Sequence, residues 1–291
     1  MDIHPDDFRV TADNPLQIKK AATRIDDIYK FKEDYAGQLA KCIDTLDELQ
    51  EKLYASSSHA LLVIFQAMDA AGKDSTIRAV LTGINPQGCQ VASFKRPTPL
   101  ELRHDFLWRC IRHLPERGMI GVFNRSYYEE VLIVRVHPDI LLGETIPDAP
   151  KDEADIWDQR YRSITELEAH LARNGTRIVK FYLHLSHEEQ RKRLLDRIDT
   201  PRKNWKFDPI DLQERESWPK YMEAYEACVN ATSTQHAPWY VVPADDKENM
   251  RLIVAQILIH TMKDMKLSFP DINETQKSEM EQARRHLMEK K

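Results

Sequence analysis

The sequence has no long apolar run and no cysteine motif, and these absences exclude membrane-spanning and disulfide-framed classes of protein. No apolar run approaches the roughly 20 residues that a helix needs to cross a bilayer. The chain also begins without the basic-then-apolar pattern of a signal peptide. The four cysteines are scattered without CxxC spacing, so they indicate neither a zinc site nor a disulfide framework. We expect a reduced, cytoplasmic protein with no membrane partner.

An excess of positive charge is lacking too. The formal net charge over 291 residues is −5, which argues against a nucleic-acid partner bound across the whole surface. Any polyanion site must therefore be a local basic patch. Hydrophobic residues make up 42% of the chain, enough for one large core or two small ones. Without an internal repeat or a low-complexity linker, a single domain over residues 1–291 is the simplest organisation.

Short apolar runs predict the strands of this domain. Four runs have the length of buried strands, and a weaker fifth lies among them; they cover residues 60–65, 90–94, 119–123, 177–185 and 239–242. Helical patterns separate the runs, which is typical of a parallel sheet covered by helices on both faces. We predict an α/β fold with a five-stranded parallel sheet flanked by helices.

The two ends of the chain differ from this core, which we place at residues 58–265. Apolar residues at three- and four-residue steps predict a helix from about Gln17 to Tyr54, within an N-terminal helical extension at residues 1–57. The tail, residues 266–291, is highly charged with few apolar residues, as expected for an exposed or frayed helix.

The stretch FQAMDAAGKDST at residues 65–76 is an incomplete phosphate-binding loop. The full pattern is Gly, four residues, Gly, Lys, then Ser or Thr. Here Ala67 replaces the first Gly and Asp74 replaces the hydroxyl. A strand before the loop and a helix after it support phosphate binding, because loop amides then meet phosphate oxygens at a helix N-terminus. The alternative is a helix entry with an exposed lysine. We predict phosphate contacts from Ala70, Ala71, Gly72, Lys73, Asp74 and Ser75.

An acidic residue, Asp69, lies inside this loop. It would repel a phosphate unless a metal ion lay between them, so we predict that it binds Mg²⁺ against a phosphate chain, with Mn²⁺ as the alternative ion. The competing interpretation is that Asp69 only caps the helix after the loop. Since Asp74 cannot act as a hydroxyl ligand, Ser75 or Thr76 would take that role, or it is absent.

A second group of polar residues comes directly after the run 119–123. Asn124 stands where kinases of this loop type have a metal-associated Asp, and Arg125 would direct a bidentate donor into the cleft. Glu129, Glu130 and Arg135 lie further along. Ligands of open α/β sheets bind at the carboxyl ends of strands, which favours a functional role over ordinary loop polarity.

Basic residues concentrate at 191–206, where the sequence RKRLLDRIDTPRKNWK has seven Lys and Arg and two Asp. Ser186 is predicted to cap the helix that leads into this stretch, and Pro201 interrupts that helix. Trp205 offers a ring that can stack on a planar group. We predict a helical lid at about 191–210 that closes over phosphates, with a solvated helix face as the alternative. Lys95 and Arg96 add a basic approach to the same sheet edge.

The stretch at residues 237–247 ends the last predicted strand in a loop that is a candidate for holding a nucleotide base. The alternative is that Asp246 only caps the next helix.

Five motifs occur in order along the chain: AMDAAGKD, FKRPT, NRSYYEEVL, RxDxPxKxWK and PWYVVPADDK. Over residues 20 to 265 they resemble the polyphosphate kinase 2 family. The resemblance implies a thymidylate-kinase-like P-loop kinase fold and Mg²⁺-dependent phosphoryl transfer between inorganic polyphosphate and nucleotides. It implies that Asp69 is the metal-binding carboxylate and Lys73 the loop lysine. Catalytic roles then fall on Asp69, Lys73, Asn124 and Arg125.

The resemblance also suggests binding residues. Polyphosphate contacts are expected from Lys95, Arg96, Arg125, Arg197, Lys203 and Lys206, and nucleotide contacts from Asn124, Glu129, Glu130, Arg135 and Trp205. Many members have Gly at the position of Ala67 and Asp at that of Asn124. The Asn with the Glu pair resembles the subgroup called class III, which converts AMP to ADP and ADP to ATP.

The expected partners are polyphosphate and adenine nucleotides, with guanine nucleotides as an alternative, in a homodimer or homotetramer. Two rival functions remain at this stage. One is an ATP-dependent nucleoside monophosphate kinase of the same fold, and the other a non-catalytic polyphosphate-binding protein. Asp69 argues against the second, because a pure anion binder gains nothing from a carboxylate in its phosphate loop.

Overall fold

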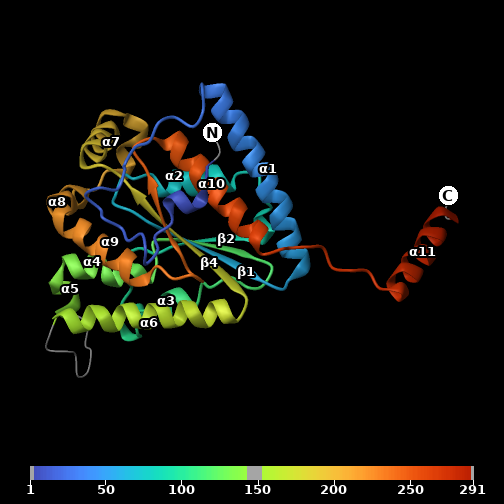
Figure 1. Ribbon diagram of the computed structural model, residues 1–291. Coiled ribbons are helices and arrows are strands. Elements are labelled where there is room, and N and C mark those ends of the chain that lie inside the picture. The colour runs from blue at the N-terminus through green and yellow to red at the C-terminus, as the bar shows by residue number, and fades with distance from the viewer. Residues whose placement is uncertain (1–2, 143–152, 290–291) are drawn as a thin grey trace.

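The structure is a computed structural model that describes residues 3–142 and 153–289. Its centre is a five-stranded sheet in the order β2-β3-β1-β4-β5, with neighbouring strands parallel (Figure 1). The strands are β1 (Ala60–Gln66), β2 (Cys89–Ser93), β3 (Ile120–Asn124), β4 (Thr176–His184) and β5 (Trp239–Pro243). The predicted α/β fold is confirmed, and each strand overlaps one of the five apolar runs.

Helices cover both faces of the sheet. One face carries α1 (Lys32–Ser56), α2 (Lys73–Leu81) and α10 (Lys247–Asp264), and the other carries α3 (Trp108–Ile111), α4 (Ile133–Val136), α6 (Glu153–Arg173) and α9 (Trp218–Thr232) (Figure 1). Alternate residues of β1 enter the two cores: Val63 and Phe65 pack on the α10 side, Leu62 and Ile64 on the α9 side. This alternation is the two-residue period of a strand that is buried on both faces.

Shorter elements lie among these helices and strands. They are α5 (Pro138–Leu142), α7 (His187–Asp199), α8 (Ile210–Glu216) and the 3₁₀ turns η1 (Pro5–Phe8), η2 (Pro86–Gly88), η3 (Glu101–Arg103), η4 (Tyr127–Val131) and η5 (Pro201–Lys206). Two local signals act as predicted: the Ser186 hydroxyl caps α7, and Pro201 separates α7 from η5. Asp246 caps α10 by accepting from the Asn249 N–H. None of the described helices is long and apolar enough to cross a membrane.

The N-terminal helix was predicted from about Gln17 to Tyr54, but it begins at Lys32. Residues 17–31 form turns and irregular chain, so the prediction was wrong over that segment. Backbone N–H groups of this segment are satisfied by side chains of distant helices: Ile18 donates to Glu226 at 2.6 Å and Ile28 to Asn249 at 3.1 Å. These partners lie 208 and 221 residues away, so spacing within the segment does not reveal them.

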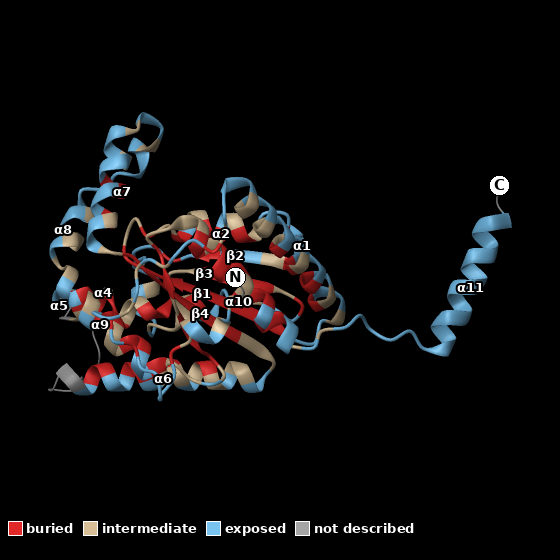
Figure 2. Cartoon of the chain, turned by 45° about the horizontal axis from the view of Figure 1, so that its top comes forward, coloured by how far each residue is buried: buried red, intermediate tan, exposed pale blue. Residues whose placement is uncertain are grey.

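The C-terminal helix α11 (Glu274–Glu289) lies apart from the rest of the molecule at the end of an extended segment (Figures 1 and 2). It contributes no buried residue, which agrees with its charged composition. At the opposite side of the molecule, α7 and α8 form the projection visible in Figure 2. The predicted lid, residues 191–210, therefore projects from the layers formed by the sheet and its covering helices.

Candidate functional site

The β1–α2 loop has the backbone of a phosphate-binding turn. Ala70 has φ 65° and Gly72 has φ 104°, both in the left-handed region, and Gly72 is the N-cap of α2. Ala67 is not among the residues with positive φ, so the alanine at the first-glycine position fits the turn without strain. Because Gly72 is the cap, the interpretation of Asp69 as a helix cap was wrong.

Lys73 folds back onto the loop that precedes it. Its Nζ donates to the Ala67 carbonyl at 2.7 Å, and its side chain is buried. Burial and the neighbouring Arg125 lower the pKa of Lys73, while Asp69, Glu129 and Asp74 oppose that shift. A phosphate oxygen would replace a neutral carbonyl with an anionic partner, which favours the charged lysine.

Asp69 and Arg125 face each other across the ends of β1 and β3. Arg125 Nη2 lies 2.9 Å from Asp69 Oδ1. The arginine backbone is also constrained, since its φ is 64° and its N–H donates to the Phe65 carbonyl at 3.1 Å. A left-handed non-glycine residue is strained and persists only where its surroundings enforce it. The guanidinium is thus held directly beside the loop carboxylate.

Glu129 joins this group from η4. Burial raises its pKa, with Arg125 and Lys73 acting in the opposite direction, and its own charge is the largest cause of the raised pKa of Arg125. The Gln66 side-chain amide is best oriented with its nitrogen toward Glu129, where it donates a hydrogen bond to Oε1 at 2.8 Å. Two cations and two carboxylates therefore meet at the carboxyl ends of β1 and β3, where the sequence placed the site.

Asn124 and the first turn of α2 form the next layer. The Asn124 amide donates to the Asp74 carboxylate, so the unusual residue of the loop and the unusual residue of β3 pair with each other. The Ser75 hydroxyl donates to the Gly72 carbonyl at 2.9 Å. The Thr76 hydroxyl is buried against Met250. Of the two hydroxyls considered for the metal role, Ser75 is the more accessible.

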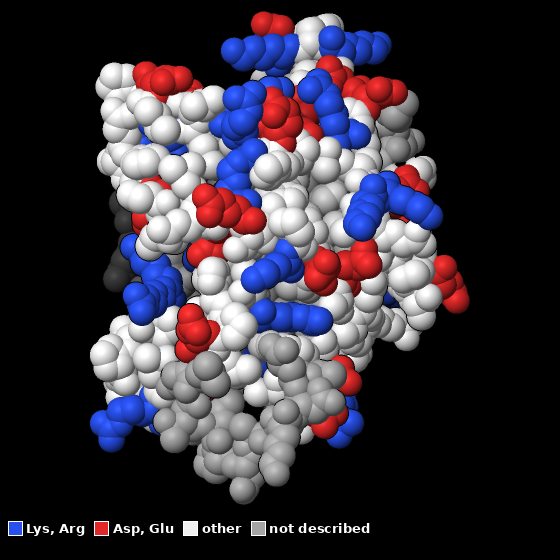
Figure 3. Space-filling model, turned by 90° about the vertical axis from the view of Figure 1, so that its left-hand side faces the viewer, with Lys and Arg blue, Asp and Glu red and all other residues white. Residues whose placement is uncertain are grey.

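Two of the predicted lid cations, Arg197 and Lys203, are paired with nearby carboxylates. Arg197 Nη1 lies 2.6 Å from Asp211 Oδ2, and Lys203 pairs with Asp196. Lys206 Nζ lies 5.0 Å from the centre of the Trp205 ring, which is 79% exposed. Figure 3 shows Lys and Arg interleaved with Asp and Glu on this side of the molecule. Phosphates that bind here must compete with these carboxylates.

The Arg197–Asp211 pair predicts a pH dependence of stability. Burial and the charge of Asp69 raise the pKa of Asp211 to about 6, from an ordinary 3.8, and Arg197 opposes this only in part. The carboxyl of Asp211 therefore loses its proton at a lower pH in the unfolded state than in the folded state. As a result, the free energy of unfolding falls as the pH rises from the ordinary pKa of 3.8 to the folded pKa of about 6. Asp211→Asn should remove this component in urea unfolding between pH 4 and 7. Equal pH profiles for both proteins would contradict the assignment.

Four other predicted residues have partners or positions of their own. Glu130 pairs with Arg160 of α6, with Nη1 3.1 Å from Oε2, and Arg135 donates to the Tyr161 hydroxyl at 2.8 Å. These two side chains turn toward α6 rather than toward Lys73. Lys95 and Arg96 are exposed in the chain after β2, and the Lys95 carbonyl accepts from Arg109.

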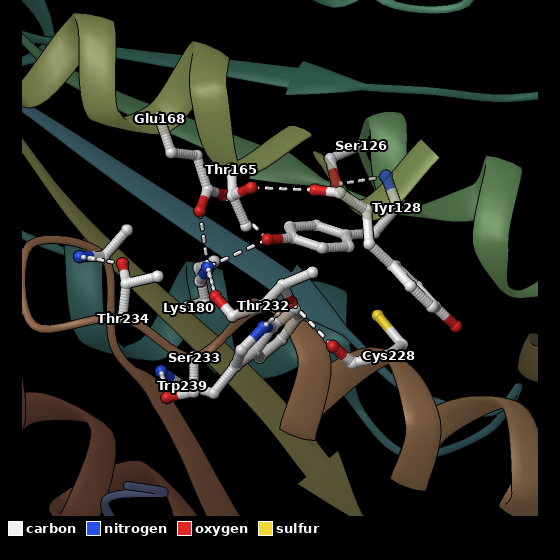
Figure 4. A network of polar contacts seen from close by, with 12 residues as sticks. Ser126, Tyr128, Thr165, Glu168, Lys180, Cys228, Thr232, Ser233, Thr234 and Trp239 are labelled. Atoms are coloured by element: carbon white, nitrogen blue, oxygen red, sulfur yellow. Dashed lines mark hydrogen bonds and ion pairs between the residues drawn. The ribbon is translucent and has the colours of Figure 1, made fainter. Parts of the chain in front are cut away.

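A buried ionic network was missed from the sequence (Figure 4). Lys180, on β4, lies 2.6 Å from Glu168 of α6, and both side chains are fully buried. Lys180 Nζ also donates to the Tyr128 hydroxyl and to the Thr232 carbonyl, each at 2.8 Å. Glu168 Oε1 accepts from the hydroxyls of Tyr127 and Tyr128 at 3.0 and 2.8 Å. The only signal was a lysine within an apolar strand, and it does not identify the partner.

Arg193 of α7 was also missed as an individual residue. It is 7% exposed, and its guanidinium donates to backbone carbonyls of the phosphate loop. In the sequence analysis Arg193 was only one of the seven cations of the basic run 191–206.

Among the described residues no cluster of three or more His, Cys, Asp or Glu is arranged to hold a metal ion. A metal at Asp69 would therefore take most of its ligands from substrate and water.

Comparisons with known proteins identify the family of the chain. Residues 29–270 match the family Polyphosphate kinase 2 (PPK2). An ADP-polyphosphate phosphotransferase of Rhodopseudomonas palustris is 57% identical over 99% of this chain and 100% of its own length. An AMP/ADP-polyphosphate phosphotransferase of Meiothermus ruber is 44% identical over 90% of this chain and 94% of its own.

A solved structure agrees as well. The crystal structure of polyphosphate kinase 2 from Arthrobacter aurescens TC1 superposes with a TM-score of 0.84, at 39% identity, over 93% of each chain. The family match over residues 29–270, the identity with these relatives and the likeness to this structure show that the protein belongs to the polyphosphate kinase 2 family.

Proposed function

We propose that this protein transfers phosphoryl groups from inorganic polyphosphate to AMP and ADP, in the manner of the class III subgroup. The observation that carries the proposal is the carboxylate of Asp69 inside a phosphate loop, paired with Arg125 at 2.9 Å and next to the buried Lys73. The activities for which the relatives are named, ADP- and AMP/ADP-polyphosphate phosphotransferase, support the same substrates.

The reaction requires positioning and charge neutralisation more than proton transfer. A nucleotide phosphate oxygen is already anionic, so it attacks the terminal phosphorus of the chain without a general base. The bond from that phosphorus to its bridging oxygen breaks, and the chain, shorter by one phosphate, leaves as an anion. The loop N–H groups and Lys73 would bind the phosphate that is transferred, and Arg125 would bind the phosphates on either side of the new bond. Arg197 and Lys203 would leave their partners Asp211 and Asp196 for the polyphosphate chain, and Lys206 would leave the Trp205 ring.

The residues present fit a divalent cation at Asp69. Mg²⁺ is usually held by one or two carboxylates together with substrate phosphates and water, which suits a loop with a single inward carboxylate. When bound, Mg²⁺ would neutralise charge on the phosphates that meet there. Mn²⁺ is the alternative ion. Asp69 would hold the ion, and the Arg125 guanidinium beside it would bind phosphate.

A direct assay tests the donor. Purified protein with Mg²⁺ is given AMP or ADP with polyphosphate, and ATP with AMP alone serves as the comparison; nucleotides are separated by chromatography. We expect ATP to form from AMP only when polyphosphate is present. ADP formed from ATP and AMP, with polyphosphate inert, would instead identify a nucleoside monophosphate kinase.

Three further properties belong to the proposal. Trp205, exposed on η5, is available to stack on a nucleotide base once the lid closes.

A cytoplasmic location agrees with the reduced state expected of the four cysteines, all of which are free thiols. Assembly into a homodimer or homotetramer stays a prediction, which light scattering coupled to gel filtration would test.

A further inference from the structure

Both terminal nitrogens of the Arg193 guanidinium donate to backbone carbonyls in the phosphate loop and just after β5. Nη1 donates to the carbonyls of Ala71 at 2.9 Å and Ala70 at 3.3 Å. Nη2 donates to those of Ala244 at 2.7 Å and Asp245 at 3.0 Å, just after β5. Nε donates to Glu189 on the same helix at 2.9 Å. An arginine has five N–H donors, and five contacts account for all of them.

A neighbour on α7 extends this pattern by one peptide. The Gln190 amide donates to the Asp69 carbonyl at 3.0 Å, and its own oxygen accepts from Arg215 at 2.9 Å. Three consecutive loop carbonyls, those of Asp69, Ala70 and Ala71, are therefore held by two side chains one turn apart on α7. Both side chains are buried.

These contacts decide where the loop N–H groups point. In a trans peptide the C=O and N–H bonds point in opposite directions. Holding the carbonyls of Asp69 and Ala71 toward α7 therefore directs the N–H groups of Ala70 and Gly72 away from it. A run of N–H groups on one side of a turn is the concave arrangement that binds anions. Ala70 in the left-handed region depends on such support, because a non-glycine residue is disfavoured there.

We propose that Arg193 is a positioning residue for phosphoryl transfer. It orients the loop amides toward the phosphate chain and joins the loop to the base of the lid, since Arg197 lies one turn further along α7. This inference rests on the proposed function only in taking the loop to bind phosphate. A lysine cannot replace Arg193, because one ammonium on a flexible stem cannot bridge two pairs of carbonyls in fixed directions.

The test compares Arg193→Lys with a matched control, Arg251→Lys. Arg251 is a half-buried arginine of α10 that donates to the hydroxyl of Tyr35 on α1 at 3.2 Å. We expect Arg193→Lys to lower kcat/KM for polyphosphate about 100-fold, as a small misplacement of binding groups does. KM for polyphosphate should rise more than KM for ADP, and the control should stay within about twofold of wild type.

Two readouts separate positioning from a general loss of stability. Amide hydrogen exchange at residues 69–72 should accelerate in Arg193→Lys, while amides of β1 and β4 exchange as in wild type. Tripolyphosphate binding, measured by calorimetry without nucleotide, should weaken by about tenfold or more. Wild-type kinetics together with unchanged exchange at the loop would overturn the proposal.

The design also separates this inference from the proposed function. If the wild type binds tripolyphosphate but transfers nothing to AMP or ADP, the function fails, and weaker binding by Arg193→Lys still supports positioning. If Arg193→Lys does not fold, Gln190→Met decides the matter, because it removes only the Asp69 carbonyl contact and the contact with Arg215. Unchanged tripolyphosphate binding and loop exchange in Gln190→Met would then overturn the proposal.

Discussion

Asp69→Asn is expected to lower kcat for phosphoryl transfer from polyphosphate by about 10²- to 10³-fold, the effect of removing one group that stabilises transition-state charge. The substitution keeps the shape of the side chain and removes the charge that would bind Mg²⁺. Arg125, 2.9 Å away, keeps a hydrogen-bond acceptor, so the fold should persist. Turnover with ADP and polyphosphate at saturating Mg²⁺ is the measurement.

A control and a structural check accompany this variant. Asp47→Asn changes an exposed aspartate on α1, remote from the loop, and should leave turnover unchanged. The thermal unfolding temperature of Asp69→Asn should stay near that of wild type, because a pair that is 27% to 36% exposed contributes little to stability. Near wild-type turnover in Asp69→Asn would rule out the metal role.

Lys180→Met is expected to reduce the free energy of unfolding by about 3–5 kcal/mol, the usual cost of leaving one member of a buried ion pair alone. Lys180 and Glu168 are 0% exposed, so water cannot solvate the carboxylate that remains. The Thr232 carbonyl also loses its donor. Urea unfolding followed by circular dichroism measures the change.

A double variant tests whether the isolated charge is the cause. Lys180→Met combined with Glu168→Gln removes both charges and leaves an amide oxygen to accept from the two tyrosine hydroxyls. It should recover a large part of the lost stability. Arg177→Met, at the start of the same strand, controls for the loss of a β4 cation. A single variant within about 1 kcal/mol of wild type would contradict the assignment.

The two predictions concern one short segment of chain. Arg125 immediately precedes the capped turn η4, and Tyr127 and Tyr128 within that turn are held by Glu168. The network therefore fixes the segment that carries Arg125 and Glu129 to the site. A buried pair on one face of the sheet thus supports charges that act at its carboxyl edge.

Local pattern was enough to predict the framework. Five apolar runs became five parallel strands because strand length and burial are recorded in consecutive residues. The loop around Lys73, the Ser186 cap and the break at Pro201 depend on neighbours a few residues apart, and the structure has all three. The five ordered motifs likewise pointed to the family that the comparisons support.

Tertiary structure alone decided which side chains meet. Adjacent glutamates diverge, so that Glu129 enters the site and Glu130 pairs with Arg160, because the 3₁₀ turn η4 points neighbouring side chains in different directions. Arg193 reaches the Ala71 carbonyl across 122 residues of chain, and Ile28 reaches Asn249 across 221. Such contacts depend on how helices dock on the sheet. The sequence by itself determined the strands, the edited loop and the family; packing determined the partners that hold the loop in shape.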